Sequence, residues 1–170
     1  MQAKSADIVF DLYCGSGGMS LYLAKKVKRV YGVELNWQAV QDANNNKILN
    51  KSDNCEFIQA DVADFVQTRL ADCNAVVVNP PRSGLATDVV NALIDAQVHR
   101  LVYVSCSPTT LARDLVLFLA QGYVVNAVEI IDFFLKLMKR SKSASIGEIS
   151  VVSSEPHPLY AFSILREFIA

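Results

Sequence analysis

The feature that most constrains this chain is its first apolar segment together with the glycine-rich turn that follows. Residues 8–18 read Ile8-Val9-Phe10-Asp11-Leu12-Tyr13-Cys14-Gly15-Ser16-Gly17-Gly18. A strand buried in a parallel sheet reads as a continuous apolar run. Glycines just past its carboxyl end let the backbone turn tightly and approach a ligand closely. The stretch therefore predicts a nucleotide-type pocket at the carboxyl edge of an open α/β sheet.

The rest of the chain alternates between expected strands and expected helices. Strands are expected near residues 8–12, 29–34, 55–60, 74–79, 100–105, 123–131 and 160–167, and helices near 18–27, 37–50, 62–70, 86–97 and 108–120. This alternation predicts a Rossmann-like α/β fold, with a mostly parallel seven-stranded sheet and helices on both faces. The length of 170 residues fits a single domain over 1–170, in which 135–158 is an irregular, basic and serine-rich segment.

Composition limits the functions that the chain can have. No apolar run reaches the roughly 18 residues of a membrane span, and the first residues do not read as a signal peptide. The four cysteines form no CxxC pair and there are two histidines, so we expect no metal and no iron–sulfur cluster in this chain. Free thiols suggest a reducing cytoplasm. The net charge of −1 gives no general attraction to nucleic acid, so RNA would need a local patch or another domain.

Two acids at strand ends fit a bound adenosine. Glu34 ends the second expected strand, 19 residues after Gly15, where a carboxylate can accept both ribose hydroxyls. Asp61 follows the third expected strand and can accept from an adenine amino group. Asp61 is equally suited to cap the next helix, and both roles can hold together.

The cofactor that fits this pocket carries positive charge. A dinucleotide fold has the pattern G-x-G-x-x-G, with backbone amides facing a pyrophosphate, and here Ser20 stands at the third glycine position. Asp11 lies four residues before Gly15, and its carboxylate would repel a pyrophosphate. S-adenosylmethionine carries an ammonium and a sulfonium group, so these residues favour it over NAD.

Two further segments carry chemistry. The fourth expected strand runs into Asn79-Pro80-Pro81-Arg82-Ser83-Gly84, where the two prolines stiffen the turn. Asn79 can read a planar base edge or the cofactor amine, and Arg82 can hold a phosphate or carboxylate. Cys106 follows the fifth expected strand, just before a helix start. A helix N-terminus stabilises a thiolate, which can act as a nucleophile; the alternative is a small buried apolar side chain.

Four blocks together resemble one known family: Asp11–Gly18, Gly32–Glu34, Asn79–Gly84 and Tyr103–Asp114. In this order, over roughly residues 7–134, they resemble the catalytic domain of the RNA uracil-C5 methyltransferases, which make 5-methyluridine in tRNA and ribosomal RNA. The Cys106 block is the most diagnostic. Asn79 stands where many members carry Asp and, with the Gly17–Gly18 turn, is more similar to the group that acts on 23S ribosomal RNA.

The resemblance implies a class I methyltransferase fold and a mechanism. The family's cysteine, matched by Cys106, adds to C6 of uracil and makes C5 nucleophilic. C5 then takes a methyl group from the sulfonium, a base removes the C5 proton, and the cysteine leaves. The target base must be single-stranded or flipped from its stack. The residues expected to bind S-adenosylmethionine are Asp11, Tyr13, Gly15, Gly17, Glu34, Asp61 and Asn79, with Asn79 and Arg82 also expected to bind RNA.

The chain departs from the family pattern in three ways. Ser107 stands where the family has Asn after the cysteine. The family's N-terminal RNA-binding parts, a small β-barrel and in some members an iron–sulfur segment, are not matched, so we expect weak, salt-dependent RNA binding. The segment that carries the family's glutamate base is altered, and two alignments stay open. One uses 155–162, in which Phe162 takes the place of the glutamate and no base remains; the other makes Glu148 the base.

Three other functions compete with this interpretation. The altered C-terminal segment fits a module that binds cofactor without turnover, for which we expect cofactor binding without an RNA adduct. Loss of the base alone would instead let methyl transfer occur and a covalent RNA adduct through Cys106 accumulate. The Asn-Pro-Pro turn also serves amino-methyltransferases of nucleic acids, although amine methylation does not need the Cys106 block. An NAD-dependent enzyme is disfavoured by Asp11 and Ser20.

Overall fold

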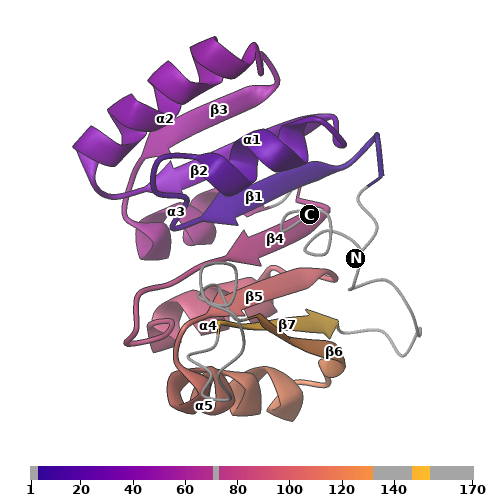
Figure 1. Cartoon of the computed structure of the whole chain (residues 1–170). Helices are drawn as coiled ribbons and strands as arrows, with labels where there is room; N and C mark the ends of the chain where they lie inside the picture. Colours follow the sequence, from indigo (N-terminus) through magenta and orange to yellow (C-terminus); the bar gives the residue numbers. More distant parts are fainter. Residues whose placement is uncertain (1–3, 71–72, 132–146, 154–170) are drawn as a thin grey trace, which may run out of the picture.

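The described part of the chain folds as a seven-stranded sheet between two layers of helices (Figure 1). The computed structural model describes residues 4–70, 73–131 and 147–153. In chain order its elements are β1 (Ile8–Leu12), α1 (Gly18–Ala24), β2 (Arg29–Glu34), α2 (Trp37–Asn50), β3 (Cys55–Gln59), α3 (Val62–Arg69), β4 (Ala75–Val78), α4 (Thr87–Asp95), β5 (Leu101–Ser105), α5 (Pro108–Ala120), β6 (Val124–Ile131) and β7 (Gly147–Ser153).

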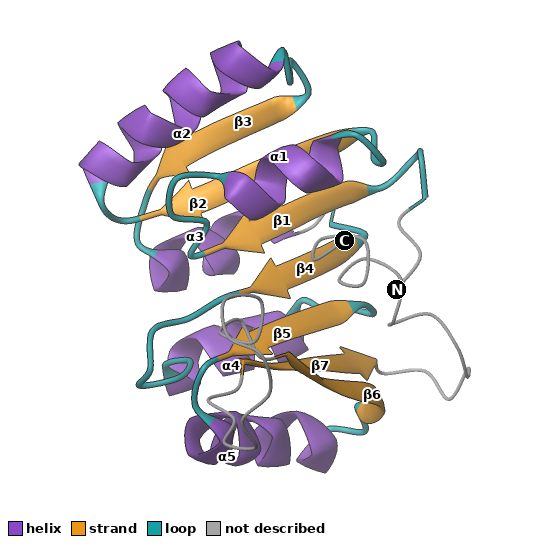
Figure 2. Cartoon of the chain, in the orientation of Figure 1, coloured by secondary structure: helices purple, strands orange, loops and turns teal. Residues whose placement is uncertain are grey.

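The order of the strands creates a crevice beside β1. The sheet runs β3-β2-β1-β4-β5-β7-β6, and the first five of these strands are parallel. The chain winds from β1 outward to β3 and then returns to the other side of β1 as β4. Such a reversal leaves a crevice at the carboxyl ends of the two central strands, where open α/β sheets bind ligands. Figure 2 shows the arrowheads of β1 to β5 on one edge of the sheet and that of β7 on the other.

Side chains alternate between two cores because successive residues of a strand point to opposite faces. In β4, Val76 and Val78 pack with α3, α4 and α5, whereas Val77 packs with α1. Strand β5 alternates in the same way at Leu101, Val102 and Tyr103. Helices therefore bury both faces of the sheet, which explains why the central strands are continuous apolar runs.

The predicted fold class is confirmed, with a difference at the C-terminal end. The strand expected near 160–167 lies outside the described residues. The seventh strand is Gly147–Ser153, inside the segment that was predicted to be irregular, and it pairs antiparallel with both β5 and β6. Its β-branched residues at 149, 151 and 152 suit a strand. The extent of the domain over 1–170 stays a prediction, because 132–146 and 154–170 are not described.

Candidate functional site

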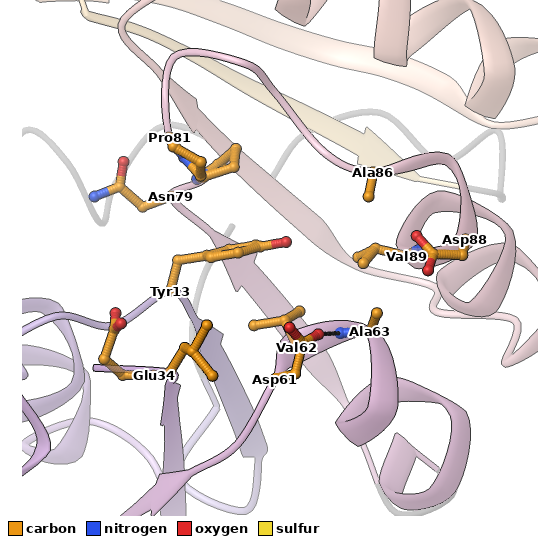
Figure 3. Close-up of a pocket in the computed structure, with 12 residues that line it drawn as sticks. Tyr13, Glu34, Asp61, Val62, Ala63, Asn79, Pro81, Ala86, Asp88 and Val89 are labelled. Carbon is orange, nitrogen blue, oxygen red and sulfur yellow. Dashed lines mark hydrogen bonds between the residues drawn. The ribbon is translucent and has the colours of Figure 1, made fainter. Parts of the chain in front are cut away.

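A cavity of about 700 Å³ opens at the carboxyl edge of the sheet, where the topology predicts a ligand site (Figure 3). It is formed by the ends of β1, β2, β3 and β4 and by the starts of α3 and α4. Three acids and no Lys or Arg stand among the described residues that line it, so the cavity is electronegative. The lining residues are Tyr13, Glu34, Leu35, Asp61, Val62, Ala63, Asn79, Pro80, Pro81, Ala86, Asp88 and Val89.

The glycine turn after β1 forms as the sequence predicts. Tyr13, Gly15 and Gly17 all have positive φ angles, of 63°, 54° and 83°. A Cβ on Gly17 would lie 2.5 Å from the Phe57 ring, so a side chain fits neither the backbone conformation nor the space. The turn is closed by hydrogen bonds from Cys14 N to Val33 O and from Gly17 N to Cys14 O. Gly15 and Gly17 thus shape the wall behind the cavity without lining it.

Glu34 has a structural role that the sequence reasoning missed. Its carboxylate accepts from the backbone N–H of Gly15 at 3.1 Å and from that of Asn36 at 2.9 Å. The acid therefore fixes the glycine turn to the end of β2. Each carboxylate oxygen has a second lone pair, so Glu34 can still accept from a ligand in the cavity.

Asp11 is buried behind the glycine turn, with 1% of its surface exposed. Ser20, which stands at the third glycine position, donates from Oγ to Asp11 Oδ2 at 2.6 Å. The sequence pattern did not predict this hydrogen bond. Oδ1 has no partner among the described residues. Burial raises the pKa of Asp11 to about 6, against the smaller lowering effect of the Ser20 hydrogen bonds.

Tyr13 projects its ring across the cavity. In Figure 3 the ring lies between Asn79 and Pro81 on one side and Asp61 and Val62 on the other. Burial, followed by the charges of nearby acids led by Asp61, raises the pKa of Tyr13 to about 12. The hydroxyl therefore stays protonated at neutral pH and can donate a hydrogen bond.

Asp61 takes up the capping role that the sequence left open. Its Oδ1 accepts from Ala63 N at 2.7 Å at the start of α3. The side chain is exposed and lines the cavity, so the second role, binding a ligand's amino group, stays a prediction. Asn79 also lines the cavity and is held at its backbone by a hydrogen bond from its N–H to Leu12 O at 3.2 Å.

Cys106 stands at the same sheet edge, directly after β5, and its side chain is exposed. It does not line the cavity. Ser107 is the N-cap of α5, where its Oγ accepts from Thr110 N. Asn and Ser are both favoured caps, which explains how Ser107 can replace the family's Asn. Burial raises the pKa of Cys73 to about 12, so that thiol stays protonated at neutral pH.

The remaining predicted site residues are Arg82 and Glu148. Arg82 is exposed on the loop after β4 and does not line the cavity. Glu148 is not in a loop: it lies in β7, with its Cα in register with Ser105, the residue before Cys106. Residues 155–162, the other candidate segment, lie outside the described residues.

In the part of the chain that the structure describes, no three His, Cys, Asp or Glu side chains gather as metal ligands. None of the described helices has the length and apolar character to cross a membrane.

Comparison with known proteins gives consistent results. The family model described as tRNA (uracil-5-)-methyltransferase matches residues 1–139. An uncharacterized RNA methyltransferase of Enterococcus faecalis is 44% identical over 132 residues, which are 75% of this chain and 29% of that protein. One of Geobacter sulfurreducens is 42% identical over 129 residues, 74% of this chain and 26% of the relative. The chain thus spans less than a third of the length of these relatives.

Solved structures share the fold. The tRNA (uracil-54, C5)-methyltransferase of Pyrococcus abyssi, solved in complex with S-adenosyl-L-homocysteine, aligns with a TM-score of 0.73 and 28% identity. The alignment covers 89% of this chain and 35% of that one. A precorrin-6y C5,15-methyltransferase of Geobacter metallireducens aligns with a TM-score of 0.72 at 17% identity, covering 89% of this chain and 82% of its own, and shows the fold alone.

Proposed function

Since the chain belongs to the tRNA (uracil-5-)-methyltransferase family, we propose that it is the catalytic part of an enzyme that methylates C5 of a uridine in RNA. The observation that carries the proposal is the position of Cys106. Its exposed thiol follows β5 at the edge of the sheet where an electronegative cavity opens beside β4. A cysteine nucleophile and a cofactor site at one sheet edge are what C5 methylation requires.

The cavity fits S-adenosylmethionine, which supplies a methyl group on a positively charged sulfur. About 700 Å³ is within the usual size of a cofactor pocket. In this proposal Glu34 holds the ribose hydroxyls and Asp61 an amino group. The buried Oδ1 of Asp11, which has no partner among the described residues, adds negative charge behind the turn. An electronegative cavity suits a cation and disfavours a pyrophosphate, which argues against NAD.

The chain's own residues then have defined tasks. The thiolate of Cys106 adds to C6 of uracil, and the electron pair moves to C5, which becomes able to accept a methyl group. Asn79 reads the edge of the base, and Arg82 holds a phosphate of the RNA. A base then removes the C5 proton, the C5–C6 double bond re-forms, and Cys106 leaves as the thiolate. Glu148 is our candidate for the base, because β7 brings its backbone beside Ser105.

The finer assignments rest on the sequence blocks. Asn79 and the Gly17–Gly18 turn resemble the group that acts on 23S ribosomal RNA, so ribosomal RNA is the proposed substrate and rRNA processing the proposed role. A cytoplasmic location is proposed on the four free cysteines. If the altered C-terminal segment lacks a base, the chain would instead bind cofactor and RNA without release of product.

The test is methyl transfer by the 170-residue chain, with the methylated nucleoside identified by mass spectrometry. The chain is incubated at low salt with labelled S-adenosylmethionine and either 23S ribosomal RNA fragments or tRNA. We expect 5-methyluridine, formed in ribosomal RNA, and its loss in Cys106→Ala but not in Cys73→Ala. Methylation of an exocyclic amine would support the amino-methyltransferase alternative, and failure to bind S-adenosylhomocysteine in calorimetry would reject both.

A further inference from the structure

A buried carboxylate in α5 joins three parts of the site. Asp114 has 1% of its surface exposed. Its Oδ2 accepts from Tyr103 Oη of β5 at 2.6 Å and from Leu85 N, in the loop after β4, at 2.8 Å. Its Oδ1 accepts from Nε and Nη2 of Arg113 at 2.9 and 2.7 Å. All four partners donate, an arrangement that suits a carboxylate and not an amide.

The same helix holds the carbonyl groups of that loop. Arg113 Nη2 donates to Ser83 O at 2.9 Å and to Leu85 O at 3.1 Å. Thr110 Oγ1 lies 3.2 Å from both Arg82 O and Ser107 O, the latter in the turn after Cys106, and its one proton can be donated to either carbonyl. One helix, whose first residue lies two positions after Cys106, therefore fixes the backbone of the loop that carries Arg82.

Gly84 shows that this contact is closely fitted. Its φ is +80°, and a Cβ there would lie 2.6 Å from Asp114 Oδ2 and 2.7 Å from Arg113 Nη2. Only glycine lets the loop backbone approach the carboxylate and the guanidinium this closely. Burial, together with the adjacent Asp114 carboxylate, raises the pKa of Tyr103, so the phenol remains a donor to Asp114.

We propose that Asp114 is a positioning residue that locks the loop 82–85 to the Cys106 turn, so that the nucleophile and the RNA-contacting loop are held as one unit. The inference rests on the proposed function. It assigns to Asp114 a role through Tyr103, Arg113 and the loop, without contact to substrate. Asn79 is anchored separately, through its N–H to Leu12 O, so the backbone position of this cavity-lining residue does not depend on the lock.

The test compares Asp114→Asn with a matched control at the opposite edge of the sheet. The new side chain in Asp114→Asn can turn its NH₂ group toward the donors of Leu85 and Tyr103 or, after a flip, toward the donors of Arg113. In each orientation the NH₂ group faces other donors, so one of the two pairs of hydrogen bonds is lost. Asp7→Asn disturbs another buried aspartate, which is 5% exposed and pairs with Arg100 at 2.9 Å. Both variants should lower the melting temperature. A loss of trapping in Asp114→Asn alone is therefore due to positioning and not to reduced stability.

The decisive readout is the rate at which Cys106 is trapped by RNA containing 5-fluorouridine in the presence of S-adenosylmethionine. We expect Asp114→Asn to slow trapping by about 100-fold, as misplacement of a reacting group by about 1 Å can do. Binding of S-adenosylhomocysteine should change less than tenfold, because Pro81 and Ala86 beside the loop also line the cavity. Asp7→Asn should trap at the wild-type rate. Trapping by Asp114→Asn within threefold of wild type, or an equal loss in Asp7→Asn, would overturn the proposal.

Hydrogen exchange makes the result independent of the reaction. In Asp114→Asn the amides of the loop 82–85 and those of the turn 105–110 should exchange faster together. Faster exchange in the loop alone would mean that the two parts are not coupled. Gly84→Ala, which disturbs the same contact from the loop side, should give the same exchange pattern. Tyr103→Phe, which removes one of the four hydrogen bonds to Asp114, should give a smaller increase in exchange at the same amides. If wild type is not trapped at all, the proposed function fails while exchange still decides the coupling.

Discussion

At the scale of single residues, one buried carboxylate links the stability of the fold to pH. The folded protein holds Asp11 with a pKa of about 6, above its usual value of 3.8. Since the folded state binds the Asp11 proton more tightly, this group stabilises the fold fully below pH 4, and the benefit is lost as pH rises through 6. At pH 7.5 the contribution of Asp11 to the unfolding free energy of the ligand-free protein is roughly 3 kcal/mol lower than below pH 4, because the buried carboxyl is then ionised.

This effect can be measured by comparing wild type with Asp11→Asn in thermal unfolding between pH 5 and 8. Other titrating groups are shared by both proteins, so their effects cancel in the difference. We expect the melting temperature of Asp11→Asn to exceed that of wild type by a margin that widens as pH rises. A margin that stays constant over this range would contradict the placement of Asp11 as a buried, poorly partnered acid.

Two adjacent glycines give a second prediction at this scale. Gly17→Ala forces a left-handed alanine against the Phe57 ring and should destabilise the protein by about 2–4 kcal/mol. Gly18 is the matched control, because a Cβ there meets nothing within 4 Å and the residue opens α1. Gly18→Ala should be neutral or slightly stabilising in urea unfolding. Equal effects of the two substitutions would show that the turn is not shaped as described.

At the scale of elements, the start of α5 decides how the Cys106 turn is held. Ser107→Ala removes the cap from Thr110 N and should cost about 1 kcal/mol of unfolding free energy, whereas Ser107→Asn should stay within a few tenths. Chemical denaturation of the three proteins checks this. If Ser107→Asn were as destabilising as Ser107→Ala, the capping explanation of this departure from the family would be wrong.

The elements also show how far the sequence could predict the structure. The strands of the central sheet were predictable because strands buried on both faces, such as β4, are continuous apolar runs. Contacts through space were not predictable: the bond from Ser20 to Asp11 and the convergence on Asp114 join residues from different elements. The position of β7 was missed because its apolar residues lie within a basic, serine-rich region that masked the strand pattern.

At the scale of the whole molecule, the parallel strands on both sides of β1 explain why motifs that are distant in the sequence lie at the same edge of the sheet. The glycine turn, the loop after β4 and the Cys106 turn all follow parallel strands, so the fold gathers them at one edge. The sequence predicted this gathering from the strand–helix alternation alone. It could not predict that Cys106 lies outside the cavity, because loop conformation sets that detail.

The net charge of the chain predicts how its affinity for RNA depends on salt. With a net charge of −1, few phosphate contacts are expected, and weak binding should fall about tenfold between 50 and 200 mM salt for two or three contacts to single-stranded RNA. Fluorescence anisotropy with a labelled uridine-containing RNA measures this dependence, and Arg82→Gln should reduce its slope. Tight binding that does not respond to salt would contradict the expected mode of contact.

The most direct test of the central claim is to map the covalent attachment of RNA to this chain. RNA containing 5-fluorouridine has no C5 proton to remove, so a methylated adduct should accumulate whether or not Glu148 acts as the base. We predict a complex that survives denaturation, requires S-adenosylmethionine, and carries the nucleotide on the peptide that contains Cys106. It should persist in Cys73→Ala and vanish in Cys106→Ala. Cofactor binding without a covalent complex, or attachment at another residue, would contradict the assignment of Cys106 as the nucleophile.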